Sequence, residues 1–293
     1  MTRILLTGAA GQVGQELQHT LAPLGEVVAV TREQMDFSQA DAVRQIVTSM
    51  QPDMIVNAAA YTAVDKAESE LELANLVNGT TPGILAEVAH QRNIGLIHIS
   101  TDYVFDGSQS TPYRETDPTQ PLGAYGSSKL LGEEAIRANC PLHMIIRTAW
   151  VYGAKGQVNF VKTMLRLGAD REELRVVADQ IGSPTWALDL ATAIAQFLPQ
   201  LSPDTAGTYH YTNSGVCSWY DFAIAIFEEA AALGFPLKIQ RVIPIPTADY
   251  PTPARRPAFS VLSLQKTTQL LGSPPPHWRQ SLRKMLLELK QLS

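Results

Sequence analysis

Short apolar runs alternate with longer amphipathic segments along the first half of the chain. Five of these runs, each bounded by turn-forming residues, are typical of strands buried on both faces: 4–7, 27–30, 54–57, 96–100 and 143–147. Between them, segments beginning at Val13, Ala40, Glu68 and Tyr125 place apolar residues at helical spacing. Because strand and helix alternate through residue 150, the pattern predicts an α/β fold with a doubly wound parallel sheet.

The alternation becomes less regular after residue 150. Prolines from Pro184 to Pro257 separate shorter elements, and helices are predicted over 188–198, 219–233, 264–271 and 278–292. We expect residues 1–150 to form the sheet domain, with 186–212 returning to it. Residues 151–185 and 213–293 are expected to form a smaller C-terminal substrate-binding domain.

Composition narrows the class of protein. The 293 residues are 45% hydrophobic, which is enough for a sizeable core, and the net charge of −5 with scattered basic residues predicts no nucleic-acid or membrane partner. Cys140 and Cys217 lack metal-ligand spacing and are expected to be packing residues. Neither a signal peptide nor an apolar stretch of 18 residues is recognisable, so we expect a cytoplasmic protein.

Three glycines follow the first predicted strand in the spacing Gly-x-x-Gly-x-x-Gly. Gly8 is expected to make a tight turn, Gly11 to let backbone amides approach a pyrophosphate, and Gly14 to let the helix pack on the strand. Gln12 and Val13, which begin that helix, belong to the same predicted site. The turn therefore predicts a Rossmann-type NAD(P)-binding domain, with a glycine-rich turn that binds no ligand as the alternative.

The second predicted strand lacks the acidic residue that usually binds the 2′-hydroxyl of NAD. Arg32 stands there instead and can pair with a 2′-phosphate, so we expect NADPH to be used at least as well as NADH. A solvated surface arginine explains the residue equally well. Asp36 and Phe37, a few residues later, are also predicted to contact the cofactor.

Small side chains follow the third predicted strand. Ala58, Ala59, Ala60 and Thr62 would let this loop lie against the cofactor at the carboxyl ends of the strands. Simple packing also accounts for the alanines, and the location favours contact with the cofactor.

Tyr125 and Lys129 lie four residues apart on a predicted helix, which places a phenol beside an ammonium group. A neighbouring cation lowers the pKa of a phenol, so Tyr125 is a candidate general acid. The segment 100–107 follows the fourth predicted strand, and its hydroxyl groups and Asp102 would project into the same crevice. Thr101, Tyr125 and Lys129 are therefore predicted to meet as a catalytic group.

This set resembles the short-chain dehydrogenase/reductase superfamily in its extended, nucleotide-sugar-modifying branch. Within that branch the chain is similar to the dTDP-4-dehydrorhamnose reductase family in four motifs, at residues 8–14, 56–68, 100–107 and 147–153. Residues 179–185 and 256–260 are similar to that family's substrate-side loops. The resemblance covers essentially the whole chain and implies NAD(P)H-dependent reduction of the 4-keto group of dTDP-4-dehydrorhamnose to dTDP-L-rhamnose.

The resemblance also implies residue roles. Tyr125 would protonate the oxygen at C4 as hydride arrives, Lys129 would lower the tyrosine pKa and hold the nicotinamide ribose, and Thr101 would hydrogen-bond the reacting oxygen. Asp102, Tyr103 and Trp150 are predicted sugar contacts, and Arg256 is a predicted partner of the nucleotide diphosphate. A core aromatic at 150 and a solvated arginine at 256 stay open as alternatives.

Three other functions stay open. An epimerase or dehydratase would use the same scaffold, but Tyr103 stands where such dehydratases carry a glutamate, and this favours plain reduction. The second open function is the reduction of another 4-ketosugar nucleotide. The third is a non-catalytic protein like the regulatory subunit of methionine adenosyltransferase.

Some relatives form homodimers bridged by a divalent metal. Glu16 and Asp189 are the matching positions, but residue 189 is the only carboxylate in its segment. We therefore predict no metal site, and a Mg²⁺-bridged homodimer is disfavoured.

Overall fold

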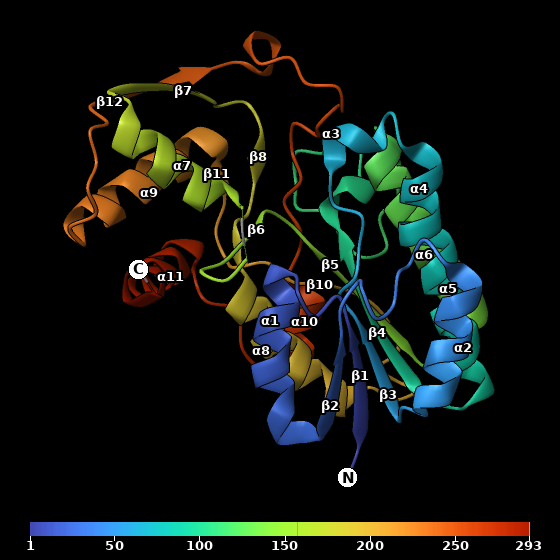
Figure 1. Cartoon of the computed structure of the whole chain (residues 1–293). Helices are drawn as coiled ribbons and strands as arrows, with labels where there is room; N and C mark the ends of the chain where they lie inside the picture. Colours follow the sequence, from blue (N-terminus) through green and yellow to red (C-terminus); the bar gives the residue numbers. More distant parts are fainter. Residues whose placement is uncertain (157, 293) are drawn as a thin grey trace.

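The computed structural model describes residues 1–156 and 158–292. A six-stranded parallel sheet lies at its centre, with strand order β10-β5-β4-β3-β1-β2 (Figure 1). The strands are β1 (Arg3–Thr7), β2 (Glu26–Val30), β3 (Met54–Asn57), β4 (Gly95–Thr101), β5 (His143–Thr148) and β10 (Gly207–His210). The first five confirm the predicted strands to within one residue at each end. The sixth, β10, lies in the segment expected to return to the sheet.

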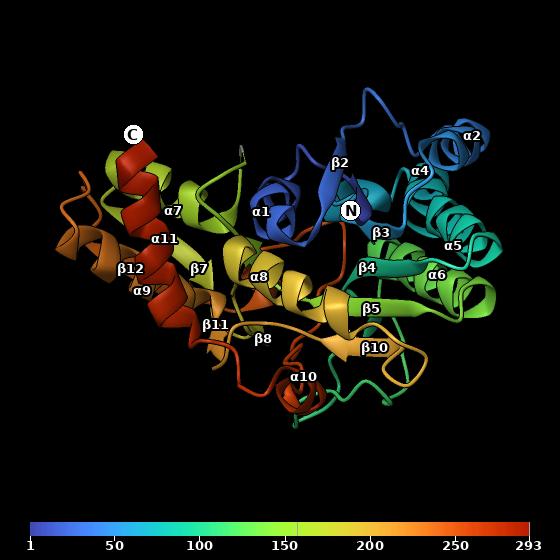
Figure 2. The same cartoon turned by 90° about the horizontal axis from the view of Figure 1, so that it is seen from below.

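Helices cover both faces of this sheet (Figure 2). One face carries α1 (Gln12–Leu21) and α8 (Ala187–Phe197), and the other carries α2 (Ala40–Met50), α5 (Thr81–Gln91) and α6 (Ala124–Asn139). Alternate residues of β1 therefore enter different cores: Ile4 and Leu6 pack with α1 and α8, whereas Leu5 packs with α2 and α5. Burial on both faces explains why β1, β3, β4 and β5 form continuous apolar runs, whereas β2, at the edge of the sheet, is only partly buried.

A second hydrophobic core lies beside the sheet. It is formed by α7 (Phe160–Asp170), α9 (Trp219–Ala232) and α11 (Trp278–Leu292), with the parallel pair β7 (Glu173–Val177) and β12 (Arg241–Ile245). Two short pairs border this core, β6 (Val151–Tyr152) with β9 (Thr185–Trp186) and β8 (Ile181–Gly182) with β11 (Cys217–Ser218), and Tyr152, Trp186 and Cys217 belong to it. We propose this core as the centre of the smaller domain. One predicted member, α10 (Gln265–Leu271), instead packs its last two leucines against the sheet core.

The helix expected from Glu68 is divided in the structure. After the short α3 (Val64–Ala67), it begins as α4 (Leu71–Asn75), widens into a π-helical segment at Leu76–Thr80 and continues as α5. Pro82 has no N–H to bond the carbonyl of Asn78, so a regular α-helix would leave that carbonyl without its helical partner. The carbonyl oxygen of Asn78 instead lies against Gly132 of α6, where a Cβ atom would approach to 2.1 Å.

Gly132→Ala is expected to destabilise the fold. Alanine normally favours a helix interior over glycine, but here its methyl group would overlap backbone, and overpacking of this kind costs about 1 to 3 kcal/mol. Ser127→Ala, at an exposed position of the same helix, is the matched control and should change stability by less than about 0.5 kcal/mol. Urea unfolding of both variants measures the difference, and a stabilised Gly132→Ala would contradict the packing described.

Candidate active site

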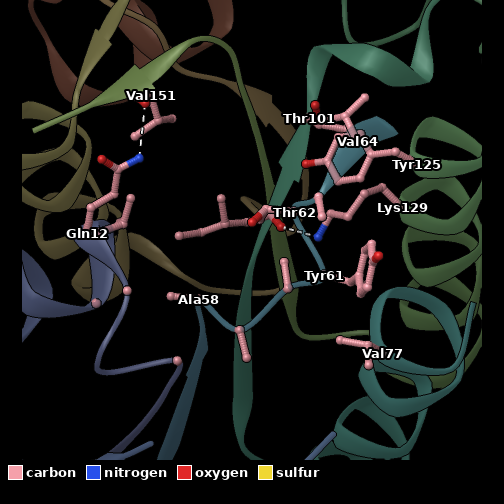
Figure 3. Close-up of a pocket in the computed structure, with 18 of the residues that line it drawn as sticks. Gln12, Ala58, Tyr61, Thr62, Val64, Val77, Thr101, Tyr125, Lys129 and Val151 are labelled. Atoms are coloured by element: carbon pink, nitrogen blue, oxygen red, sulfur yellow. Dashed lines mark hydrogen bonds between the residues drawn. The ribbon is translucent and has the colours of Figure 1, made fainter. Parts of the chain in front are cut away.

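A cleft of about 850 Å³ opens at the carboxyl ends of β1, β3 and β4. The strand order reverses here, and this is where open α/β sheets bind ligands. Every predicted site residue except Arg256 lines the cleft: Gly8, Gly11, Gln12, Val13, Gly14, Arg32, Asp36, Phe37, Ala58, Ala59, Ala60, Thr62, Thr101, Asp102, Tyr103, Tyr125, Lys129 and Trp150. Gln12 lies on one wall, and Thr101, Tyr125 and Lys129 lie on the opposite wall (Figure 3).

The glycine turn forms the wall at the start of α1. Gly8 has a φ of +69°, and a Cβ atom there would lie 2.6 Å from the backbone of Ala58. A Cβ at Gly14 would lie 2.1 Å from the carbonyl oxygen of Gly8. No side chain caps the first turn of α1, so its amides are available to an anion such as a pyrophosphate. The Gln12 amide donates to the carbonyl of Val151 at 3.0 Å, which joins this wall to β6 (Figure 3).

Arg32 lies at the rim of the cleft beyond β2. Its side chain is 78% exposed, and its Nε atom lies 3.6 Å from a carboxylate oxygen of Asp36. The backbone N–H of Ser38 and the charge of Arg32 hold the pKa of Asp36 below its ordinary value. Phe37 is buried in the core beneath them. An exposed cation therefore stands at this rim, with Asp36 as its neighbouring carboxylate.

Burial dominates the electrostatics of the catalytic group. It raises the pKa of Tyr125 to about 12, against a hydrogen bond with Thr101 and with a further rise from the charge of Asp102. Burial thus outweighs the fall in this pKa that was expected beside Lys129, and the catalytic role of Lys129 stays a prediction. Lys129 is 1% exposed, and its Nζ donates to the carbonyl of Ile99 at 2.7 Å. Burial lowers the pKa of Lys129 to about 8, although Glu133 acts in the other direction.

Asp102 and Tyr103 extend this wall toward the smaller domain. The Thr101 hydroxyl donates to Asp102 Oδ1 at 3.1 Å, and burial raises the pKa of this carboxyl to about 6. The ring of Tyr103 meets the ring of Tyr125 edge-on, with 5.5 Å between their centroids. Both side chains thus flank the phenol expected to act as the acid.

Trp150 lies where the sheet domain meets the second core. Its backbone has a φ of +48°, and its indole stacks on Trp219 with 3.5 Å between centroids and 8° between planes. It also packs against the second core while lining the cleft. Trp150 is therefore both a core aromatic and a wall of the cleft, so each of the two interpretations is partly correct.

Arg256 does not line the cleft. Its guanidinium forms two hydrogen bonds with the carboxylate of Asp65, at 2.9 and 3.1 Å, and another with the carbonyl of Ala254. This pairing holds the pKa of Asp65 below its ordinary value. Because Asp65 already balances the charge of Arg256, its contact with a nucleotide diphosphate stays a prediction.

Comparison with known proteins places the chain in a family. A family model described as the RmlD substrate binding domain matches residues 1–291. The chain belongs to this family. It is 49% identical to the dTDP-4-dehydrorhamnose reductase of Escherichia coli strain K12, over 98% of this chain and 97% of that protein. The resemblance inferred from the motifs is thereby confirmed.

Solved structures of the RmlD family agree with the fold. The dTDP-4-dehydrorhamnose reductase of Bacillus anthracis, in complex with NADP, is 37% identical with a TM-score of 0.90 and covers 98% of this chain and 100% of that chain. The enzyme of Clostridium acetobutylicum is 38% identical with a TM-score of 0.91, covering 99% and 100%. The Rossmann-type fold predicted for this RmlD-family chain is confirmed.

Sequence reasoning missed several buried polar residues of the site. Asn78, in the π-helical segment, accepts from the Tyr61 amide at 2.8 Å and donates to the Tyr61 carbonyl and to Ser128 Oγ, each at 3.0 Å. It thereby fixes the loop after β3 against α6. Asn57 and His98 lie below the cleft, where they bond to each other. The available signal was a polar residue inside an apolar run, as His98 is within 96–100.

The carboxylates considered for a metal bridge have protein partners. Glu16 accepts from Lys155 Nζ at 3.0 Å, and Asp189 accepts from Asn213 and Ser281. Over residues 1–156 and 158–292, no group of three or more metal-ligating side chains is placed to hold an ion.

Within the same ranges, no helix is long and apolar enough to cross a bilayer.

A buried ion pair supports the catalytic wall from behind. The carboxylate of Glu133 accepts from Arg147 Nε and Nη2 at 2.9 and 2.7 Å and from Ser100 Oγ at 2.6 Å. Burial raises the pKa of Glu133, but these bonds and the charges of Arg147 and Arg137 outweigh it and hold the pKa below its ordinary value. Because Glu133 lies one turn after Lys129, the pair fixes the helix that carries the catalytic residues.

Glu133→Gln is expected to destabilise the protein by about 3 to 5 kcal/mol at pH 7, because Arg147 loses its buried partner. The folded pKa of Glu133 is depressed, so its contribution is present above the unfolded value of 4.5 and is lost as pH falls through the folded value. The difference from wild type should therefore shrink in acid. Denaturant unfolding at several pH values measures it, with the exposed Glu134→Gln as control; equal effects of the two variants would contradict the role of the pair.

Proposed function

We propose that this chain reduces the 4-keto group of dTDP-4-dehydrorhamnose with NADPH and releases dTDP-L-rhamnose. The observation that carries the proposal is one cleft with a glycine turn on one wall and Thr101, Tyr125 and Lys129 on the other. The chain's membership of the RmlD family, and the names of its relatives, support the substrate. A homodimer and a cytoplasmic location stay predictions from the sequence.

The residues present fit a dinucleotide. The uncapped first turn of α1 and the close contact between Gly8 and Ala58 leave backbone amides facing the cleft, as a pyrophosphate requires. Arg32 stands where a 2′-phosphate would extend, and Lys129 lies deeper, beside the catalytic tyrosine. When bound, NADPH would supply the hydride.

Tyr125 would supply the proton. Its pKa of about 12 means that the phenol keeps its proton at neutral pH and can donate it to the oxygen at C4 as negative charge develops there. Thr101 lies at the end of β4 with its hydroxyl beside Tyr125, where it is placed to hydrogen-bond the same oxygen. The Tyr103 ring against Tyr125 limits the directions from which the sugar can approach.

Two alternatives fit the site less well. A dehydratase or epimerase needs further acid–base chemistry on the sugar, and position 103 offers a phenol in place of a carboxylate. A purely regulatory protein does not require Thr101, Tyr125 and Lys129 to share a wall. Stoichiometric oxidation of NADPH by the keto sugar separates reduction from both.

Tyr125→Phe is expected to lower kcat by about 10²- to 10⁴-fold, because the variant lacks the donated proton. Affinity for NADPH and thermal stability should stay close to wild type. Tyr220→Phe, which removes the hydroxyl group of a tyrosine on α9 outside the lining of the cleft, is the control and should retain most activity. The measurement is NADPH oxidation with dTDP-4-dehydrorhamnose and with UDP- and GDP-linked 4-keto sugars; turnover of only a non-dTDP substrate would overturn the named substrate but not the chemistry.

Arg32→Ala is expected to weaken NADPH binding by about tenfold or more, because a charge-assisted hydrogen bond contributes about 1.5 to 3 kcal/mol. Binding of NADH lacks the 2′-phosphate and should be unchanged. Titration of both cofactors into wild type and variant gives the ratio of affinities, with Arg92→Ala, an exposed arginine just after α5 and outside the cleft, as the charge control. An equal loss for both cofactors would argue against a 2′-phosphate contact.

A further inference from the structure

Two carboxylates at one short helix contact different parts of the catalytic wall. Asp65 lies in α3, and Glu68 follows the last residue of that helix. The neighbours Val64 and Lys66 line the cleft, whereas neither acidic residue does. A spacing of three places the two carboxylates on adjacent positions of one helical turn. Asp65 nevertheless bonds to the segment 252–256, and Glu68 bonds to the start of α6.

The segment 252–256 folds around the ion pair of Asp65 with Arg256. The Asp65 carboxylate accepts from both terminal nitrogens of the guanidinium, at 2.9 and 3.1 Å, and from the amide N–H of Ala254 at 3.2 Å. Arg256 in turn donates to the carbonyl of Ala254 and to the hydroxyl of Thr252. Removal of this carboxylate would therefore leave three N–H groups of the segment without their acceptor.

The same segment lies behind Tyr103, which lines the cleft. Burial raises the pKa of Tyr103, with a further rise from Asp102, and the charge of Arg256 opposes that rise. The guanidinium is thus close enough to act on the phenol. Pro257, the next residue, packs against Gly107, where a Cβ atom would lie 2.6 Å from the proline ring. The position of the segment is therefore felt by the loop that carries the predicted sugar contacts.

Glu68 fixes the first turn of α6. Its Oε1 accepts from the amide N–H of Ala124 at 2.9 Å, and this amide is one of those that have no partner within the helix. A Cβ atom at Gly123 would lie 2.5 Å from Glu68 Oε1 and 4.0 Å from the carbonyl oxygen of Arg255. The start of α6, Glu68 and Arg255 therefore meet at one point, and Tyr125 is the residue after Ala124.

We propose that Asp65 and Glu68 are positioning residues for the reduction. Asp65 keeps segment 252–256 in place behind Tyr103. Glu68 keeps the first turn of α6, and with it Tyr125, in place. This inference deepens the proposed function and rests on it.

The two tyrosines that these carboxylates support pack on each other. The rings of Tyr103 and Tyr125 meet edge-on, and a Cβ atom at Gly126 would lie 2.2 Å from the carbonyl oxygen of Tyr103. Because the packing is this close, a shift of either support changes the space beside the two phenols. Loss of the Asp65 contacts should act on binding of the sugar, and loss of the Glu68 contact should act on transfer of the proton.

Steady-state oxidation of NADPH by dTDP-4-dehydrorhamnose separates these roles. Asp65→Asn cannot form the two-pronged pair and should raise the KM of the keto sugar about tenfold, with kcat nearly unchanged. Glu68→Ala should lower kcat by about 10- to 100-fold, because a small misplacement of a catalytic group costs this much. Glu68→Gln still offers an oxygen to Ala124 and should restore most of the kcat. The affinity for NADPH should stay close to wild type in all three variants.

Glu72→Gln, an exposed acidic residue of α4 outside the lining of the cleft, is the matched control and should behave as wild type. A kcat of Glu68→Gln as low as that of Glu68→Ala, or an equal loss in Glu72→Gln, would overturn the proposal.

A double-mutant cycle tests whether Asp65 acts through Arg256. If it does, Asp65→Asn and Arg256→Gln each raise the KM of the keto sugar, and the double variant raises it no further than the stronger single change. Effects on KM that multiply would mean that the two residues act independently, which contradicts a positioning role for Asp65. If Glu68→Ala does not fold, this cycle decides.

Hydrogen exchange of the full-length, cofactor-free protein needs no substrate. The amide of Ala254 should exchange faster in Asp65→Asn, and the amide of Ala124 should exchange faster in Glu68→Ala, with both unchanged in Glu72→Gln. Unchanged exchange at Ala254 and Ala124 in these variants would overturn the proposal. Absence of turnover by wild type with every keto sugar would instead refute the proposed function, while the exchange rates still report the two contacts.

Discussion

A lysine that is 1% exposed needs partners for its ammonium group inside the protein, and this requirement at Lys129 governs the geometry of the catalytic wall. Its bonds to the Ile99 carbonyl and to His98 join α6 to β4. Tyr125, one turn earlier, consequently faces Thr101 at the end of that strand, and Glu133, one turn later, meets Arg147 of β5. Three residues at four-residue intervals thus attach one face of α6 to two adjacent strands.

Below this wall, the sheet contains two polar networks in an otherwise apolar interior. One passes through Asn57 and His98 to the catalytic lysine, and the other joins Ser100, Glu133 and Arg147. Polar groups buried in this way destabilise a fold unless every donor meets an acceptor, so they specify a single arrangement of strand and helix more strictly than apolar packing does. The catalytic residues are therefore oriented largely by groups behind the cleft, since of the residues that support them here only Ser100 also lines it.

The sequence predicted the sheet well because β1, β3, β4 and β5 are buried on both faces and appear as apolar runs, and the partly buried edge strand β2 also keeps an apolar run. β10 escaped prediction as a strand because it is a four-residue edge strand beginning with Gly207. The site residues were predictable because parallel strands bring their carboxyl ends to one edge. The pairing of Arg256 with Asp65 could not be predicted, since 191 positions separate these residues and only the folded chain brings them together. The rise in the Tyr125 pKa was missed for a similar reason, because the spacing of two residues carries no information on their burial.

The chain passes repeatedly between the sheet and the second core. It leaves after β5 for β6, returns from β9 directly into α8, leaves again after β10 for β11, and packs α10 on the sheet before α11 joins the second core. A rotation of one part against the other would have to change the backbone at every one of these crossings. Entry of substrate and exit of product are therefore expected to use local shifts of the loops that line the cleft more readily than a wide opening of the two parts.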